Sequence, residues 1–530
     1  MTVSRQKKLE IGACALLGAA LLSLYAYLPS AGLTVYASPD ETAMAVAARE
    51  IGAHFHAYLS EPLAVAFPWL HPRSWVSQDG KITTVGFIGW PMIASVFWKI
   101  FGDRSLPWIG GLLILSAAYP FYRLLRRRFE PLAAFLGTLV AFTYPAMILY
   151  ANRGLFPNAP VLACGLWTLW LIDRLRSNPK TGVASWIALG LLVSATTIIR
   201  PVELVWILPW WIWTGWGMKA ARKQWIAAIL SFFVLLIPVF ILQHQASGHW
   251  WSFGYLLKDN IVPSASASVV PSVASRPWWL PFGFHPRNIL FNMRSFLLGL
   301  VWPWMLAIGL AFIASVLALK RRLFDVRQSA PILIAAWTVL ILLLVYGNGK
   351  YADNIQPDAV TIGNSFLRYL LPLALIVGWS VAYLSRYIRR LRVRPLRAAA
   401  LSILILFSVA LAVQGVLSAT VNDAEGLATT RGELIRYAAF REEAKQWLNP
   451  SQTVFSDRSD KIFFPAFRAV SPMPPLNDVA TFIRNENATS GLFIRPMAQS
   501  DKDAWRSAGV DVSAVGASGR EQLYLLTPRP

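Results

Sequence analysis

Long apolar segments recur along most of this chain, and they constrain its fold more than any other feature. A transmembrane helix needs about 20 predominantly apolar residues. Eleven candidate spans can be delimited: residues 9–28, 106–124, 131–150, 158–173, 183–199, 201–217, 225–243, 296–318, 330–346, 366–384 and 399–418. No small-residue cleavage site follows the first span, so we expect it to be retained as an anchor. The sequence predicts a mainly α, polytopic membrane helical bundle with about 11 transmembrane helices.

The basic residues are concentrated in every second loop between these spans. The loops in question lie at residues 123–128, 174–180, 219–223, 320–327 and 386–397. A net charge of +22 would suggest nucleic acid in a soluble chain, but 56% of the residues are hydrophobic and only 14% are charged. Cytoplasmic loops of membrane proteins carry an excess of Lys and Arg. The pattern therefore predicts a multi-pass protein of the inner or plasma membrane with a cytoplasmic N-terminus and no nucleic-acid partner.

This topology leaves three long segments on the outer face, at residues 29–105, 244–295 and 347–365. Within the first, the apolar stretch 85–101 contains Gly86, Gly89 and Pro91, and we expect it to be a helix at the interface. From about residue 420 the composition becomes that of a water-soluble domain. Helices are expected at 433–448 and 478–485, and strands at 453–455, 491–494 and 522–526. We therefore divide the chain into a membrane domain, 1–418, and a small extracytoplasmic α/β domain, 419–530.

Two adjacent carboxylates, Asp40 and Glu41, follow the first span in the sequence Ser38-Pro39-Asp40-Glu41. Acidic residues favour a helix N-terminus, so a capping role is one interpretation. The other is that one carboxylate acts as a general base and accepts a proton from an acceptor hydroxyl or amine as it attacks a sugar carbon. Ionisable groups at a membrane are expensive to hold, and this favours the functional interpretation.

Four cationic side chains are predicted on the same face as this pair: Arg153, Arg200, Arg368 and Lys350. Each alone is explained equally well by a side chain that extends to the interface. Together they could surround an anionic group, since the planar guanidinium fork donates two parallel hydrogen bonds to phosphate.

Two histidines and one asparagine complete the set of candidate residues. His54 and His56 are two positions apart, so they lack the spacing of three or four residues typical of paired metal-binding histidines on a helix. For them we favour packing or contact with an acceptor. Asn158, in Phe156-Pro157-Asn158, is a further candidate contact for the sugar or acceptor.

The order of these motifs resembles the GT-C superfamily of membrane glycosyltransferases. The similarity is greatest to the branch that uses polyprenyl-phosphate sugars and contains protein O-mannosyltransferases and the aminoarabinose transferase of lipid A. The shared features are the acidic pair after the first span, the long first outer loop ending in a Gly/Pro-bearing helix, and an outward C-terminal domain. Arg200-Pro201 and the sequence from Arg368 to Pro372 also match.

The resemblance implies transfer of a hexosyl or pentosyl group, with inversion, from a polyprenyl phosphate to an extracytoplasmic lipid, glycan or protein. It implies that Asp40 is the base, that Glu41 supports it, and that Arg200 and Arg368 hold the lipid phosphate, with Arg153 and Lys350 as weaker candidates. Relatives often carry an acidic residue where this chain has Asn158. We therefore expect no obligatory cofactor or metal ion, and an optional divalent cation is left open. In a bacterial host the carrier would be undecaprenyl phosphate.

The alternative is a polytopic transporter or flippase of lipids or glycans. Such proteins usually carry charges near the bilayer midplane and often internal repeats. In this chain the charges lie at the ends of the spans and no repeat is visible, which favours the enzyme.

Overall fold

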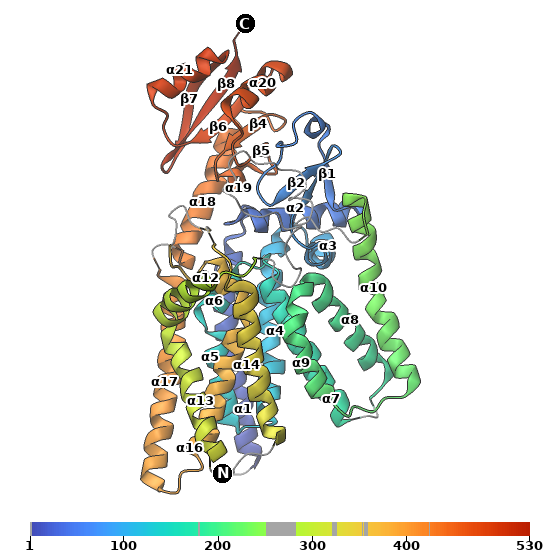
Figure 1. Cartoon of the computed structure of the whole chain (residues 1–530), viewed down its shortest axis with the longest axis vertical. Coiled ribbons are helices and arrows are strands. Elements are labelled where there is room, and N and C mark those ends of the chain that lie inside the picture. Colours follow the sequence, from blue (N-terminus) through green and yellow to red (C-terminus); the bar gives the residue numbers. More distant parts are fainter. Residues whose placement is uncertain are drawn as a thin grey trace. The chain divides into compact units, whose positions relative to one another are not determined.

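A computed structural model describes residues 3–178, 181–250, 282–320, 326–351, 353, 359–422 and 425–529. Most of the second outer segment predicted at 244–295 lies outside the described residues. The chain divides into two compact units, whose elements are labelled in Figure 1. Unit 1 comprises residues 1–30, 107–237 and 275–429, and unit 2 comprises residues 31–106, 238–274 and 430–530.

Every predicted span coincides with helical structure. The helices concerned are α1 (Val3–Tyr25), α4 (Leu106–Arg126), α5 (Pro131–Phe142), α6 (Pro145–Asn152), α7 (Asn158–Ser177), α8 (Val183–Ile199), α9 (Leu204–Gly215), α10 (Arg222–Ser247), α13 (Trp302–Lys320), α14 (Val326–Tyr346), α15 (Ser365–Tyr369), α16 (Pro372–Ile388) and α17 (Arg394–Thr420). Shorter pieces are the 3-10 turn η4 (Pro201–Glu203), α12 (Pro286–Asn292) and the π-helix η6 (Met293–Leu300). The chain is a mainly helical polytopic membrane protein, as predicted.

The number of uninterrupted spans is smaller than the eleven counted from the sequence. Among the described residues, four helices are long and apolar enough to cross a bilayer alone, within α1, η3–α4, α10 and α17, where η3 is the turn Asp103–Ser105. Three further pairs of helical segments are long and apolar enough only when the two members are taken together, and each pair is bent at a short break. The bend is 60° between α5 and α6, 112° between α8 and α9, and 97° between η6 and α13. If each bent pair is counted as one span, the described residues contain up to seven spans. Proline follows two of these breaks directly, at Pro145 and Pro201. Because proline lacks an N–H and disfavours helical backbone at the preceding residue, it divides an apolar run that looks continuous in sequence.

Glycine permits close helix crossings in unit 1. A Cβ atom on Gly137 of α5 would lie 2.4 Å from the carbonyl oxygen of Gly378 in α16. A Cβ on Gly190 of α8 would likewise meet the backbone of Ala228 in α10. Small residues at crossings let backbones approach in a membrane, where packing rather than the hydrophobic effect drives association. At these two crossings a side chain would force the facing backbones to shift.

The first outer segment in unit 2 contains two helices and a small sheet. Helix α2 (Pro39–His54) packs against α3 (Gly89–Phe101). Strands β1 (Tyr58–Ser60), β2 (Trp75–Gln78) and β3 (Lys81–Thr84) form an antiparallel sheet in the order β1-β3-β2. The helix expected at 85–101 is confirmed as α3, although it begins at Gly89.

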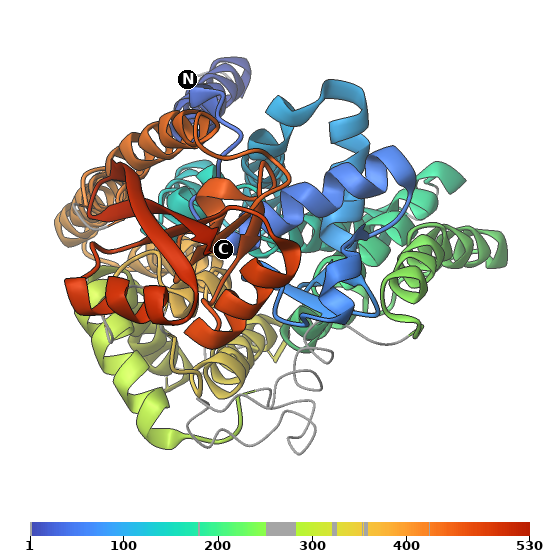
Figure 2. The same cartoon turned by 90° about the horizontal axis from the view of Figure 1, so that it is seen from above.

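The C-terminal part of unit 2 has the predicted α/β composition. Its elements are α18 (Leu427–Ala444), β4 (Thr453–Ser456), α19 (Asp460–Phe463), β5 (Arg468–Val470), α20 (Leu476–Glu486), β6 (Ser490–Ile494), α21 (Gln499–Ser507), β7 (Val510–Ser518) and β8 (Glu521–Pro528). The strands form one mixed sheet in the order β5-β4-β6-β8-β7, with α20 and α21 beside it (red in Figure 2). Strands β5 and β7 were not expected, because β5 has three residues and β7 carries Ser, Gly and Asp.

The first outer segment and the C-terminal strands share their hydrophobic cores. Trp75 and Ile82 lie in one cluster with Phe440 and Phe463, and Leu70 lies in another cluster with Phe455. Two ion pairs join the same segments: Arg73 with Asp460 and Arg468 with Glu61, with nitrogen–oxygen distances of 2.8 Å in both. Residues 31–106 and 430–530 therefore fold together, whereas the division of the chain at 418/419 stays a prediction.

Candidate functional site

The acidic pair lies in the first turn of α2. Ser38 is the N-cap, and its side chain accepts a hydrogen bond of 3.1 Å from the backbone N–H of Asp40. Carboxylates in this turn are stabilised by the helix dipole. The acidic pair thus lies in the helix turn that favours negative charge, whereas the N-cap itself is Ser38.

The two carboxylates differ in accessibility. Glu41 is only 4% exposed, whereas Asp40 is half-buried. The Ser74 hydroxyl donates a hydrogen bond to Oδ1 of Asp40. Ser74 has a φ of +63°, which is uncommon for a residue with a side chain. A carboxylate oxygen accepts hydrogen bonds, and the one from Ser74 orients Asp40.

The histidines lie at the opposite end of the same helix. Fourteen residues separate Asp40 from His54, which corresponds to about 21 Å along an α-helix. His56 stacks on Tyr58 with ring centroids 4.4 Å apart, and its Nδ1 lies 3.9 Å from a carboxylate oxygen of Glu50. The structure therefore does not bring the histidines to the acidic pair, and their contact with an acceptor stays a prediction.

In unit 1, Arg200 occupies the break between α8 and η4. Its backbone is extended, with φ −153° and ψ 92°, as expected for a residue that precedes proline. Nε lies 3.1 Å from Oε1 of Glu203, and the guanidinium donates a 3.0 Å hydrogen bond to the hydroxyl of Tyr346. That hydroxyl in turn donates to Glu203. At this break the Arg200 side chain leaves the helix and joins a network with Glu203 and Tyr346, in which the Glu203 carboxylate compensates its charge.

Arg368 and Arg153 lie on the same aromatic ring. The guanidinium carbon of Arg368 is 4.3 Å from the ring centroid of Phe156, and that of Arg153 is 4.7 Å from it. Arg368 is 8% exposed, and it donates a 2.9 Å hydrogen bond to the hydroxyl of Ser365. An arginine over a ring face is attracted by the ring quadrupole, so Phe156 holds two guanidinium groups of like charge near one another.

Tyr369 joins Arg200 to this pair. Its ring centroid lies 4.8 Å from the guanidinium carbon of Arg200 and 5.1 Å from that of Arg368. The structure therefore brings together three of the four predicted cations, which we call the arginine cluster: Arg153, Arg200 and Arg368, with Phe156 and Tyr369 between them. These side chains come from the end of α6, the α8–η4 break and α15.

The fourth predicted cation, Lys350, is exposed and lines a neighbouring cavity of about 300 Å³. Arg287 and Asn292 also line this cavity, as does Tyr351. The ring of Tyr351 lies 5.6 Å from that of Tyr369, so the cavity adjoins the arginine cluster.

Asn158 is the first residue of α7 and follows Phe156 by two positions. It is 5% exposed, and its Oδ1 has no hydrogen-bond partner in the part of the chain that the structure describes. A buried amide oxygen without a partner is costly. This atom is therefore available to a ligand or a water molecule.

Sequence reasoning did not identify Tyr346, Tyr369 and Ser365 as parts of the network. Tyr369 follows Arg368 directly, so the Arg-Tyr pair was a usable signal, whereas Tyr346 and Ser365 join the site only through tertiary contacts. No group of three or more His, Cys, Asp and Glu side chains among the described residues could hold a metal ion.

Two crystal structures of ArnT from Cupriavidus metallidurans are similar to this chain. The apo structure has 14% sequence identity and a TM-score of 0.55, and the match covers 97% of this chain and 98% of that one. The structure bound to undecaprenyl phosphate has 12% sequence identity and a TM-score of 0.55, and the match covers 99% of this chain and 98% of that one. This chain has the ArnT fold. The fold that the sequence resemblance implied is thus confirmed.

Other comparisons add little to the ArnT match. The oligosaccharyltransferase of Archaeoglobus fulgidus, in complex with zinc and sulfate, matches with 13% identity, a TM-score of 0.47, and coverage of 94% of this chain and 69% of that one. No protein-family model matches the sequence, and no curated protein matches it. One fold supports many activities, so the function of this chain is argued from its residues.

Proposed function

We propose that this protein is an integral membrane glycosyltransferase. It moves a sugar, with inversion, from a polyprenyl-phosphate donor to an extracytoplasmic lipid, glycan or protein. The observation that carries the proposal is the arginine cluster, in a chain with the fold of ArnT. Because one ArnT structure is bound to undecaprenyl phosphate, a polyprenyl phosphate is the first lipid to test here.

The chemistry of the arginine cluster suits the phosphate of such a donor. Three guanidinium groups converge on two rings. Carboxylates belong to the same network: Glu203 pairs with Arg200, and Asp353 accepts a hydrogen bond from the Ser365 hydroxyl to which Arg368 donates. Each guanidinium has five N–H donors. When the bond between sugar and phosphate breaks, negative charge develops on the phosphate, and fixed cations stabilise that charge in the transition state.

In the proposed reaction, an acceptor hydroxyl or amine attacks the anomeric carbon of the sugar. A bond forms between that carbon and the acceptor atom, and the bond from the carbon to the phosphate oxygen breaks. The phosphate oxygen keeps the electron pair, and polyprenyl phosphate leaves. Asp40 takes the proton from the acceptor, and Glu41 supports Asp40. Asn158 contacts the sugar or the acceptor, and Lys350 assists with phosphate. No metal ion is required in this scheme.

The proposal includes the predicted topology. The N-terminus is cytoplasmic, the C-terminal domain is extracytoplasmic, and the protein spans the inner or plasma membrane several times. The reaction then takes place on the outer face, where the activated sugar arrives on its lipid and no nucleotide pocket is needed.

The test uses purified protein in nanodiscs, a panel of polyprenyl-phosphate sugars, and membrane extract as acceptor. Release of polyprenyl phosphate is compared between the wild type and Asp40→Asn. General base catalysis contributes about 10²- to 10⁴-fold, so the variant should lose that much of kcat while its binding of undecaprenyl phosphate is unchanged. Equal kcat would remove Asp40 as the base. Movement of lipid across the bilayer without sugar transfer from any donor would support a transporter instead.

A further inference from the structure

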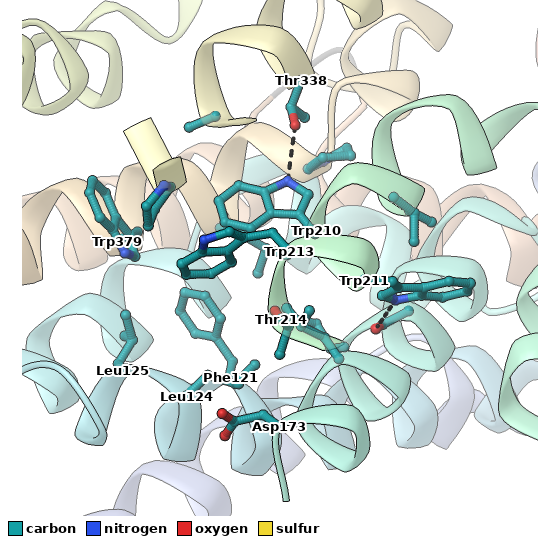
Figure 3. A pocket seen from close by; sticks show the side chains of 18 of the residues that line it. Phe121, Leu124, Leu125, Asp173, Trp210, Trp211, Trp213, Thr214, Thr338 and Trp379 are labelled. Carbon is teal, nitrogen blue, oxygen red and sulfur yellow. Dashed lines mark hydrogen bonds between the residues drawn. The ribbon is translucent and has the colours of Figure 1, made fainter. Parts of the chain in front are cut away.

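A second cavity, of about 570 Å³, lies among the helices of unit 1 (Figure 3). Side chains of α4, α7, α9, α14 and α16 line it. Along α9 the lining extends from Trp206 to Thr214, or about 12 Å at the rise of an α-helix. One leaflet of a bilayer has about 15 Å of hydrocarbon, so the cavity is comparable in length with half of the membrane core.

The walls of this cavity are aromatic. Trp206, Trp210, Trp211, Trp213 and Trp379 line it, and Figure 3 shows the last four of these indoles. Several of their N–H groups are bonded to the protein: that of Trp210 donates to the Thr338 hydroxyl at 3.0 Å and that of Trp211 to a backbone carbonyl at 3.3 Å. Since these polar atoms are satisfied by the protein, the walls offer mainly apolar ring surface to an occupant.

One end of the cavity is cationic. Arg127, Arg128 and Arg176 line it, together with the single carboxylate Asp173. Nε of Arg127 lies 2.6 Å from Oδ2 of Asp173 and is neutralised by it. Asp173 also interacts electrostatically with Arg128 and Arg176, but with three guanidinium groups and one carboxylate the lining of this end keeps two positive charges in excess.

The two remaining arginines are both held against the C-terminal turn of α9. The guanidinium carbon of Arg128 lies 4.4 Å from the ring centroid of Trp213. Arg176 donates a 3.1 Å hydrogen bond to the carbonyl oxygen of Thr214. The sequence predicts this end of the helices to be cytoplasmic, since Arg127, Arg128 and Arg176 lie in loops assigned to that face.

We propose that this cavity binds an anionic phospholipid of the surrounding membrane, with an acyl chain between the tryptophans and the phosphate on Arg128 and Arg176. An elongated apolar cavity suits a hydrocarbon chain, and two fixed guanidinium groups suit a phosphodiester. Basic pockets between transmembrane helices on the cytoplasmic side are a recurring form of anionic-lipid site. The proposal is independent of the proposed sugar transfer.

The test is native mass spectrometry of the full-length protein with phosphatidylglycerol and phosphatidylcholine of identical acyl chains. The wild type should retain phosphatidylglycerol and bind phosphatidylcholine at least tenfold more weakly. The double variant Arg128→Gln/Arg176→Gln should lose at least tenfold in phosphatidylglycerol binding. Arg123→Gln is the matched control, because Arg123 is an exposed arginine at the same end of α4 that does not line the cavity.

A second variant tests the chain-binding part separately. Ala335 lines the cavity from α14, and Ala335→Trp would fill part of it. This variant should lose phosphatidylglycerol while both arginines remain. Phosphatidylglycerol should also raise the thermal midpoint of the wild type and of Arg123→Gln but not that of the double variant, because a ligand stabilises the state that binds it.

Three results would overturn the proposal. Unchanged phosphatidylglycerol binding in the double variant would remove the arginines from the site. Equal binding of phosphatidylcholine would show that charge is not recognised. Displacement of phosphatidylglycerol by equimolar undecaprenyl phosphate in the Arg368→Gln background, in which the arginine cluster is altered, would assign the cavity to the polyprenyl lipid.

Discussion

Replacing Arg368 by lysine or glutamine tests the arginine cluster most directly. In the wild type the guanidinium lies between the rings of Phe156 and Tyr369 and is anchored by Ser365. Lysine keeps the charge but has a compact ammonium group without the planar fork. Glutamine removes the charge. The two variants therefore separate the contribution of charge from that of geometry.

The expected magnitudes follow from these contacts. A hydrogen bond to a charged group contributes about 1.5–3 kcal/mol. If lysine makes one such bond where arginine makes two, polyprenyl phosphate should bind about 10- to 150-fold more weakly. Removing one partner of a buried, hydrogen-bonded charge pair costs about 2–5 kcal/mol. Arg368→Gln should therefore weaken binding about 30- to 4,000-fold.

The assay is a titration of each variant in nanodiscs with undecaprenyl phosphate at fixed ionic strength. Arg294→Gln is the matched control, since Arg294 lies in η6 on the same predicted face and is exposed. Thermal midpoints of all variants establish that each is folded. The order wild type, lysine, glutamine is expected. A lysine variant equal to the wild type would refute the role of the planar fork, and a glutamine variant equal to the control would refute phosphate binding by Arg368.

Three further predictions concern stability, each measured as the thermal midpoint of the purified protein. Asp460→Ala should lower the free energy of unfolding by about 3–5 kcal/mol, because Asp460 is 1% exposed and its loss leaves Arg73 without its buried partner. An unchanged thermal midpoint would mean that this ion pair does not hold the two parts of unit 2 together. Gly137→Val should cost about 1–3 kcal/mol by overpacking against α16, whereas Gly309→Val, with open space around the new Cβ, should cost less. Burial raises the pKa of Glu521, so the folded state binds more protons than the unfolded state above pH 4.5. The wild type should therefore lose stability relative to Glu521→Gln as the pH rises from 4.5 towards 7. A stability difference between the two proteins that does not depend on pH would contradict this.

Much of the secondary structure was predictable because it depends on local composition. Apolar runs predicted where helices occur, and the change of composition near residue 420 predicted the α/β region. The number of uninterrupted spans was not predictable in the same way. Pro145 and Pro201 lie inside or between apolar runs, and whether a proline bends or ends a helix depends on its neighbours in space. Strand β7 was missed because its alternation is interrupted by Gly516, at an irregularity in its pairing with β8.

Among the candidate site residues, too, some predictions of proximity held in the structure and others did not. Arg153, Arg200 and Arg368 were identified from their positions at the ends of predicted spans, and the structure brings them together. His54 and His56 were grouped with Asp40 because they are near in sequence, but a helix of 16 residues separates them in space. Nearness in sequence along a helix translates into distance at 1.5 Å per residue.

The sequence by itself determined that this chain is a membrane protein with basic loops, an acidic pair after its first span, and arginines at the span ends. These features are read from residue type and order, because the bilayer imposes its length and charge rules on any segment that crosses it. Only the tertiary structure decided that Phe156 and Tyr369 gather three arginines, that Ser74 orients Asp40, and that five tryptophans help to line a second cavity. Each of these results depends on contacts between segments far apart in the chain, which no local pattern specifies.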